Sequence, residues 1–172
     1  MGTEAMVRPE QPEDLPAIRF VNERAFGRLA EANLVDTLRG RGKVLLSLVA
    51  LLDGRVIGHI LFSPAAIESK TVLFPVVCLA PMAVLPEYQR QGVGSLLVEK
   101  GLEVLLRAGH DAVIVLGHAE YYPRFGFVPA TRYGIRCEFD VPDEVFMAIE
   151  LRPEALLGHH GVLRFQPEFQ AV

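Results

Sequence analysis

The sequence lacks three features that would point to particular classes of protein. No uninterrupted apolar run approaches the roughly 18 to 20 residues that a membrane helix needs, although 51% of the residues are apolar. No dense cluster of lysine and arginine is present, and a net charge of −4 with a pI near 5.7 gives no general attraction for nucleic acid. The first residues, MGTEAMVRPE, contain no basic segment followed by an apolar one. We therefore expect a soluble, cytoplasmic protein that binds neither membranes nor nucleic acid.

Cysteine is scarce, and the side chains that commonly bind metals are not grouped. Cys78 and Cys137 lie far apart in strand-like apolar segments, so we interpret them as reduced, buried thiols rather than as a disulfide or a nucleophile. The adjacent His159 and His160 have no cysteine or carboxylate partners at ligand spacing. We therefore expect no bound metal.

The length of 172 residues is close to that of one common domain. The sequence contains no internal repeat, no low-complexity tract and no linker between domains. We expect a single domain over residues 5–172, in which residues 153–172 form a C-terminal extension with an added strand. The alternation in GVLRF, residues 161–165, favours a strand that joins the sheet within its own subunit or across a homodimer.

Hydrophobic periodicity predicts a mixed α/β protein. Asp53-Gly54 is typical of a tight hairpin turn, which predicts an antiparallel start to the sheet. Later, a strand, a long helix and a very apolar strand follow one another, which implies a parallel pair with a right-handed crossover. We expect a single mixed, mostly antiparallel sheet with a central parallel strand pair, flanked by helices. The expected helices begin near residue 14 and cover 31–41 and 95–108, and the expected strands are 6–8, 44–52, 56–62, 76–84, 112–117, 145–151 and 161–165.

A glycine-containing loop precedes the long helix in VLPEYQRQGVGSLLVEK, residues 84–100. A helix N-terminus presents unpaired N–H groups and a partial positive charge, and Gly92 and Gly94 would let an anion approach the backbone. A simple turn is the alternative for a bare Gly-x-Gly. Two known phosphate loops are excluded, because Gly94 is followed by Ser95 rather than lysine and because Leu97 stands where a dinucleotide fingerprint needs its third glycine.

The same stretch resembles the acetyl-CoA signature of the GNAT superfamily of N-acetyltransferases. The core of that signature is Arg or Gln, two residues, Gly, one residue, then Gly or Ala, and Gln89, Gly92 and Gly94 match it. A second landmark of the superfamily, an aromatic pair followed by Gly-Phe, is similar to YYPRFGF at residues 121–127. The order of elements resembles the superfamily over about residues 5–152. GHAEYYPRFGF together with GVLRFQPEF is most similar to the YhbS-like group of predicted bacterial N-acetyltransferases.

The resemblance implies that acetyl-CoA, as cosubstrate, lies where two parallel strands separate. Its pantetheine arm would pair with a strand edge as a peptide does, and its pyrophosphate would contact backbone amides of the loop. For Arg90, a charge-assisted contact with the pyrophosphate and a solvated surface position are both open. The residues implied in cofactor binding are Met82, Ala83, Val84, Gln89, Arg90, Gln91, Gly92, Val93, Gly94 and Ser95.

Within the second landmark, Tyr122 stands where the superfamily often places its general acid, five residues before Phe127. The resemblance implies that Tyr122 protonates the departing thiolate. Tyr121 is its neighbour, and packing under the sheet is the alternative role for either tyrosine. The sequence does not single out a general base, and the family often removes the proton through water. The conceivable bases are Glu31, His59, His110, His118 and Glu120.

These observations predict an N-acetyltransferase that transfers the acetyl group of acetyl-CoA to a primary amine by direct attack in a ternary complex. The acceptor would be a small molecule, a peptide terminus or a lysine, held by residues 26–42, 62–72 and 132–144. The alternative is a non-catalytic domain that binds or senses acyl-CoA, because a fold alone does not supply activity.

Overall fold

The computed structural model describes residues 4–172. Its three α-helices over these residues are α1 (Leu15–Phe26), α2 (Ala30–Gly40) and α3 (Val93–Arg107). The helices and strands are connected by turns, several of them one-turn 3₁₀ helices. The strands are β1 (Met6–Pro9), β2 (Leu46–Leu52), β3 (Arg55–Glu68), β4 (Leu73–Val84), β5 (Ala112–Leu116), β6 (Val128–Pro129), β7 (Ile135–Cys137), β8 (Phe146–Glu150) and β9 (Gly161–Arg164).

The strands form one sheet in the order β1-β2-β3-β4-β5-β8-β6, and β9 pairs with both β3 and β7. The β4–β5 pair is parallel, as the strand-helix-strand order predicted. A second parallel pair, β7–β9, was not predicted. The mixed, mostly antiparallel α/β fold with a central parallel pair is therefore confirmed. Among residues 4–172, no helix is both long and apolar enough to cross a membrane.

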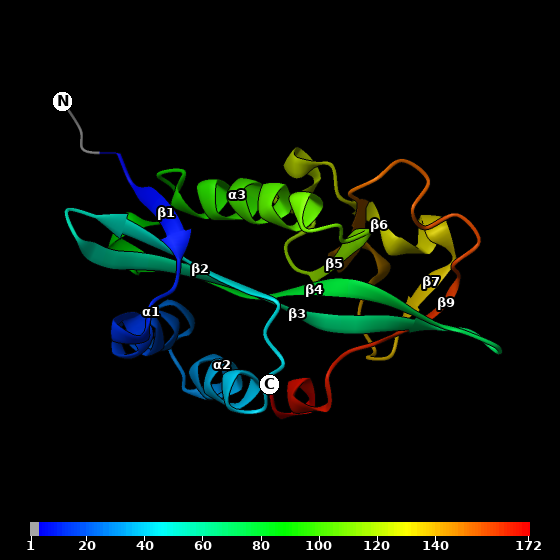
Figure 1. Ribbon diagram of the computed structural model, residues 1–172, viewed down its shortest axis with the longest axis horizontal. Helices are drawn as coiled ribbons and strands as arrows, with labels where there is room; N and C mark the ends of the chain where they lie inside the picture. The colour runs from blue at the N-terminus through cyan, green and yellow to red at the C-terminus, as the bar shows by residue number, and fades with distance from the viewer. Residues whose placement is uncertain (1–3) are drawn as a thin grey trace. The chain divides into compact units, whose positions relative to one another are not determined.

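The chain divides into two compact units. Unit 1 contains residues 4–62, 81–101 and 168–172, and unit 2 contains residues 63–80 and 102–167. In unit 1, β1 and β2 and the first part of β3 pair antiparallel, and α1 and α2 lie on one face of these strands while the start of α3 lies on the other (Figure 1). The apolar core between these layers includes Ile18, Val21, Leu38, Leu48, Ile60 and Leu97.

A glycine allows α3 to approach the sheet closely in unit 1. A Cβ atom built on Gly101 would lie 2.5 Å from two ring atoms of Phe62, which is fully buried. Real Cβ atoms do not approach other atoms so closely, so the ring occupies the space that any side chain at position 101 would need. The Phe62 ring on β3 thus occupies the space left free on α3 by Gly101.

The C-terminal residues of unit 1 are fastened by a buried carboxylate. The Glu168 side chain is 3% exposed, and its Oε1 accepts from Arg41 Nη1 at 2.9 Å and from Lys43 Nζ at 2.8 Å. These cations hold the pKa of Glu168 at about 2, below its ordinary value. The last turn of the chain is therefore tied to the residues that follow α2.

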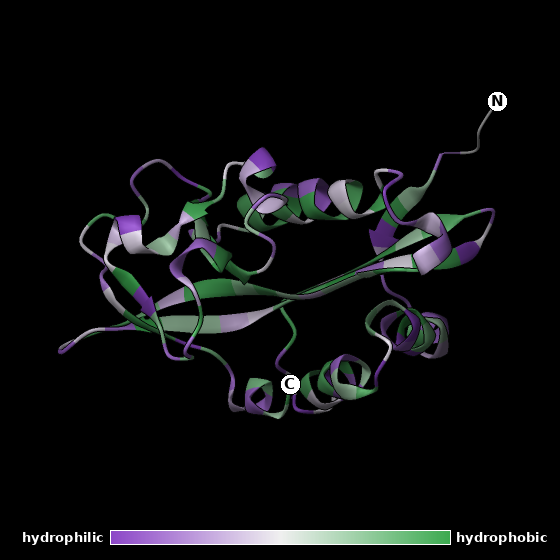
Figure 2. Ribbon diagram, turned by 180° about the vertical axis from the view of Figure 1, so that it is seen from behind, coloured by the Kyte–Doolittle hydropathy of each residue, from purple (hydrophilic) through white to green (hydrophobic). Residues whose placement is uncertain are grey.

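In unit 2, β5 pairs with β4 on one side and with β8 on the other. The register joins Val77 to Val113 across the parallel pair and Ala112 to Glu150 across the antiparallel pair. Figure 2 shows that the central strands are hydrophobic along much of their length. The core of this unit includes Val76, Val113, Ile114, Phe127, Met147 and Leu163.

The element boundaries differ from the prediction in instructive places. β3 and β4 extend beyond the predicted ends, because Pro64 and Pro75 interrupt the apolar runs without ending the strands. α3 begins at Val93 rather than at residue 95. Cys78 is a buried free thiol as predicted, whereas Cys137 is a free thiol but only half-buried.

Candidate active site

The loop that precedes α3 is anchored to the end of β4. Buried Leu85 donates its N–H to the carbonyl of Ile57 at 2.9 Å, and a 3₁₀ turn then covers Pro86–Tyr88. The Gln89 side-chain amide donates to the Val84 carbonyl at 2.9 Å. Gln89 therefore shapes the loop through its side chain.

Gly92 is the last residue before α3, and its backbone has a φ of +86°. The Leu96 N–H bonds to the Gly92 carbonyl at 3.0 Å, which starts the helical hydrogen-bond series. The amides of the first turn come before this series and lie at the positive end of the helix. The predicted Val93, Gly94 and Ser95 thus all belong to the first turn of α3 rather than to the loop before it.

Arg90 is exposed and has a φ of +63°, a left-handed conformation that costs a residue other than glycine about 1–2 kcal/mol. Within residues 4–172 no carboxylate forms an ion pair with its guanidinium. Gln91 is also exposed, and its side-chain amide donates to the Glu87 carbonyl at 3.1 Å. The loop therefore presents a strained, unpaired cation beside the start of the helix, as anion sites commonly do.

The predicted pantetheine edge lies at the end of β4. Its register with β5 runs from Val77 to Leu79, and β4 continues beyond that pairing to Val84. Met82 is half-buried, while Ala83 and Val84 are 2% and 8% exposed. Residues 82–84 thus lie in the part of β4 that follows its last residue pair with β5. Backbone groups in such a segment suit pairing with an extended ligand.

In unit 2, Tyr122 is 6% exposed and packs edge-on against Phe127, with ring centroids 5.5 Å apart. A side chain at Gly117 would overlap the Tyr122 ring, so this glycine leaves room for the phenol. Burial raises the pKa of Tyr122 well above its ordinary value of 10.0. The phenol therefore keeps its proton near neutral pH and is available as a donor.

The neighbouring Tyr121 has a different environment. It is half-buried, and the Arg124 guanidinium lies 4.6 Å from the centroid of its ring, in a cation–π arrangement. The two rings meet edge-on, with centroids 5.1 Å apart. The tyrosine pair therefore consists of one buried phenol and one that packs under a cation.

Comparison with known proteins places this geometry in a family. A family model described as an acetyltransferase (GNAT) domain matches residues 43–129. The chain is 37% identical over 165 residues to the uncharacterised N-acetyltransferase YhbS of Escherichia coli K12, a match that covers 95% of this chain and 98% of that protein. The chain belongs to the GNAT family of acetyltransferases. The resemblance inferred from the two sequence landmarks is thus confirmed, and the chain is an N-acetyltransferase, one of the acyltransferases.

Two crystal structures of GNAT proteins share the fold of this chain. YhbS from Escherichia coli in complex with CoA matches with a TM-score of 0.93 at 36% identity, covering 99% of this chain and 94% of that chain. A GNAT family acetyltransferase from Brucella melitensis in complex with acetyl-CoA matches with a TM-score of 0.78 at 32% identity, covering 97% and 99%.

Two of the five conceivable bases of this GNAT protein are engaged within unit 1. His59 is fully buried, where the Asn22 amide contacts its Nδ1 at 3.1 Å and Ser47 Oγ contacts its Nε2 at 2.9 Å. Burial lowers the pKa of His59 to about 3, with Arg39 adding to this effect and Glu10 opposing it. Glu31 is 5% exposed, and its two carboxylate oxygens share the single N–H of Arg28 Nε. Neither side chain is accessible to a substrate amine.

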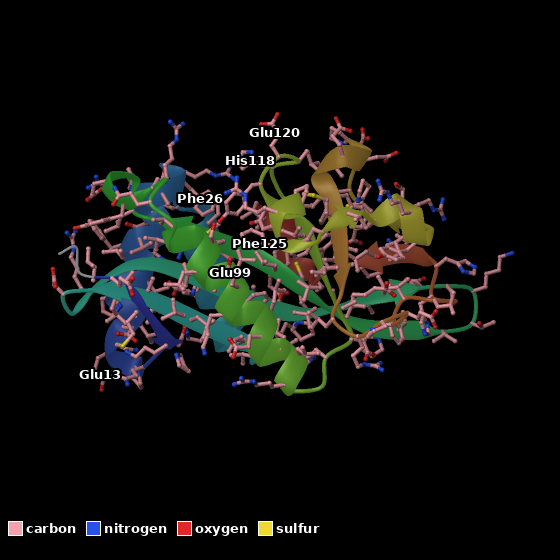
Figure 3. The ribbon with its side chains drawn as sticks, turned by 90° about the horizontal axis from the view of Figure 1, so that it is seen from above. Glu13, Phe26, Glu99, His118, Glu120 and Phe125 are labelled. Carbon is pink, nitrogen blue, oxygen red and sulfur yellow. The ribbon has the colours of Figure 1, made fainter. Side chains whose placement is uncertain are left out.

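The other three conceivable bases lie in unit 2. His118 and Glu120 are exposed on the segment between β5 and Tyr122, and Glu120 points away from the chain in Figure 3. The His118 carbonyl accepts the N–H of Tyr121 at 3.1 Å, so this segment also positions the tyrosine pair. His110 is half-buried at the turn after α3. His118 and Glu120 are thus accessible to solvent, whereas His59 and Glu31 are not.

The hydrogen bonds around His59 form a chain from the buried ring to the half-buried Glu10 and Arg39, which the sequence did not reveal. Because the Asn22 amide donates to Nδ1, the proton of the neutral ring lies on Nε2 and is donated to Ser47. Ser47 in turn donates to Glu10, which also accepts from Arg39 Nη2 at 2.8 Å. The members come from α1, α2, β2, β3 and the segment after β1, so no local sequence pattern connects them.

This buried histidine should make stability depend on pH. The unfolded chain binds a proton at His59 below about pH 6.5, whereas the folded chain does so only near pH 3, so the free energy of unfolding falls as the pH drops from 6.5 towards 3. We expect a loss of about 2 kcal/mol between pH 7 and pH 5, because the slope approaches about 1.4 kcal/mol per pH unit once the unfolded histidine is protonated. Urea denaturation at several pH values measures it. Glu10, whose pKa is lowered, adds to the loss only below its ordinary value of 4.5.

Substitution of the buried histidine tests the source of this pH effect. His59→Gln should flatten the slope of stability against pH. If His59→Gln does not fold, NMR titration of the wild-type ring replaces it. A His59 ring that titrates between pH 6 and 7 in the folded protein would contradict the expectation.

No metal centre is visible among residues 4–172, where no group of three or more His, Cys, Asp and Glu side chains is placed to hold an ion. His159 instead stacks on Phe74, with ring centroids 3.5 Å apart and planes 11° from parallel. His160 is exposed beside it. The histidine pair therefore has an aromatic contact and no ligand set.

Proposed function

We propose that this GNAT protein transfers the acetyl group of acetyl-CoA to a primary amine, by direct attack of the amine in a ternary complex. The observation that carries the proposal is the start of α3, where Gly92 at positive φ presents bare backbone before the first helical turn. The matching structures of YhbS with CoA and of the Brucella melitensis protein with acetyl-CoA support this donor. The acceptor is a small molecule, a peptide terminus or a lysine side chain.

The proposed donor site comprises residues 82–84 and 89–95. The amides of the pantetheine arm would pair with the end of β4, and the pyrophosphate would accept hydrogen bonds from backbone N–H groups at the start of α3. Arg90 would add a charge-assisted contact, since no carboxylate within residues 4–172 pairs with it. Gln89 would act by holding the loop to Val84, because its side-chain amide is already engaged there.

In the proposed reaction, the amine nitrogen attacks the carbonyl carbon of the thioester. The C–N bond forms, the C–S bond breaks, and the departing sulfur takes the phenolic proton of Tyr122. The amine loses one proton to water or, through water, to His118 or Glu120. Backbone N–H groups near Val84 would stabilise the developing oxyanion, and the Tyr122 phenol recovers its proton from solvent before the next cycle.

We also propose the setting in which the protein acts. Both cysteines are free thiols, which suits the reducing cytoplasm. The proposed domain spans residues 5–172 with residues 153–172 as an extension, and a homodimer is the assembly to be tested by light scattering.

A screen of amines tests the proposed activity. Purified protein, acetyl-CoA and a panel of polyamines, amino acids, aminoglycosides and peptides are incubated, and released CoA is measured with a thiol reagent. We expect thiol release with at least one amine and an equal amount of acetylated product by mass spectrometry. Binding of acetyl-CoA by calorimetry without turnover on any amine would favour the non-catalytic acyl-CoA-binding domain instead.

A further inference from the structure

A pocket of about 740 Å³ lies in unit 2, at the turn that joins β3 to β4. Its walls come from that turn, from β9 with the segment before it, and from β7. Figure 1 shows β7 and β9 side by side next to this end of the β3–β4 hairpin. The volume is typical of small-molecule sites, which occupy about 300–1,000 Å³. The proposed donor site does not use this pocket, whereas residues 67–72 and Arg136 of its lining fall within segments that the sequence analysis expected to hold the acceptor.

Backbone pairing fixes the shape of the pocket. β9 pairs antiparallel with the end of β3, where Val162 faces Glu68, and parallel with β7, where Val162 faces Arg136. Gly161 begins β9 with a φ of +149°, and a side chain there would collide with the carbonyl oxygen of Glu68. A glycine at this position therefore allows β9 to close against β3.

One wall of the pocket is aromatic. Phe74 and His159 line it and stack face to face at 3.5 Å, and both are half-buried. A flat, partly exposed pair of rings suits contact with a planar or apolar part of a ligand.

The charges at the pocket favour an anion. The lining contains three cations, Lys70, Arg136 and Arg164, and a single carboxylate, that of Glu68. Glu68 pairs with Arg164 at 2.9 Å, whereas Lys70 and Arg136 pair with no carboxylate in the part of the chain that the structure describes. The tip of the turn is correspondingly hydrophilic in Figure 2. The pocket lining therefore carries a positive charge, although the net charge of the chain is −4.

We propose that this pocket binds a small organic anion. Its carboxylate or phosphate contacts Lys70 and Arg136, and its planar or apolar part lies beside the Phe74–His159 stack. Arg164 is held by Glu68 and Glu138, so it forms a fixed part of the wall. The proposal does not depend on acetyl-CoA binding, because it concerns a ligand at residues that the donor site does not include.

NMR titration of the full chain with benzoate and with phenyl phosphate tests the proposal and separates carboxylate from phosphate ligands. We expect one or both anions to shift backbone amides of residues 68–74 and 158–162. Arg136→Gln and Lys70→Gln should each weaken this binding roughly tenfold, the loss expected for one charge-assisted hydrogen bond.

Two matched controls distinguish a built site from general charge attraction. Arg132→Gln removes an exposed arginine of the same unit that does not line the pocket, and it should leave the affinity unchanged. Benzamide, the neutral analogue of benzoate, should bind at least roughly tenfold more weakly, since it lacks the charge. The absence of shifts at residues 68–74 with both anions, or equal affinity in Arg136→Gln, Lys70→Gln and the wild type, would overturn the proposal. Neither result would bear on acetyl-CoA binding, which is measured separately by calorimetry.

Discussion

Replacing Tyr122 with phenylalanine is expected to lower the turnover number by about 10²–10⁴-fold, the usual contribution of a general acid. The variant loses one oxygen and keeps the ring that packs against Phe127, so acetyl-CoA affinity and thermal stability should change little. Thiol release with a working acceptor amine gives the turnover number, and calorimetry gives the affinity. Because the pKa of Tyr122 is raised, the wild-type turnover number should not fall through ionisation of this phenol near its ordinary pKa of 10.0.

Tyr121→Phe is the matched control, because the same atom is removed from the adjacent residue. Tyr121 packs under Arg124, so we expect a far smaller effect on turnover. Substitution of a tyrosine whose only role is packing would change stability or acetyl-CoA binding rather than the rate of the chemical step. If Tyr122→Phe retained full turnover with chemistry shown to limit the rate, the proton donor would be Tyr121, water or no side chain.

Gly92→Val should remove most of the affinity for acetyl-CoA, at least roughly tenfold, which corresponds to 1.4 kcal/mol. The space that a Cβ would enter at Gly92 is open, and this is where the pyrophosphate is proposed to approach the backbone. Valine would fill that space and would also oppose the φ of +86°. Calorimetry with CoA and acetyl-CoA measures the loss, and circular dichroism checks that the variant is folded.

Gly109→Val separates obstruction of the ligand from backbone strain. Gly109 follows α3 with a φ of +89° and has equally open surroundings, so valine there should cost a similar 1–2 kcal/mol or so of stability. Its acetyl-CoA affinity should stay at the wild-type value. Gly92→Asn adds a side chain while tolerating the left-handed backbone, and it should still weaken binding. Unchanged CoA affinity in folded Gly92→Val would exclude this loop as the donor site.

The general fold could be predicted because its signals are local. The apolar runs, the Asp53-Gly54 turn and the strand-helix-strand order each lie within a short stretch, and together they predicted the sheet and its central parallel pair. The glycine loop was recognisable for the same reason. β6 and β7 are too short to show periodicity, and the part of β3 beyond Pro64 pairs with β9, which is distant in the sequence.

Features that depend on contacts between distant parts of the chain could not be predicted from the sequence. His59 was one of several conceivable bases, and only burial beside Asn22 and Ser47 reveals it as a neutral member of a hydrogen-bonded chain. The cationic pocket likewise draws on residues from three separate parts of the chain. The sequence made Tyr122 a candidate general acid, but its buried environment beside Gly117 became visible only in the folded protein.

The contact between Gly101 and Phe62 limits how sequences with this packing can change. Alanine at position 101 would require the ring of Phe62 to move, and a smaller side chain at position 62 would leave a cavity beneath the helix. The two changes made together exchange volume between α3 and β3, so their effects on stability should not add. Positions 62 and 101 should therefore tolerate compensating substitutions made together better than either substitution made alone.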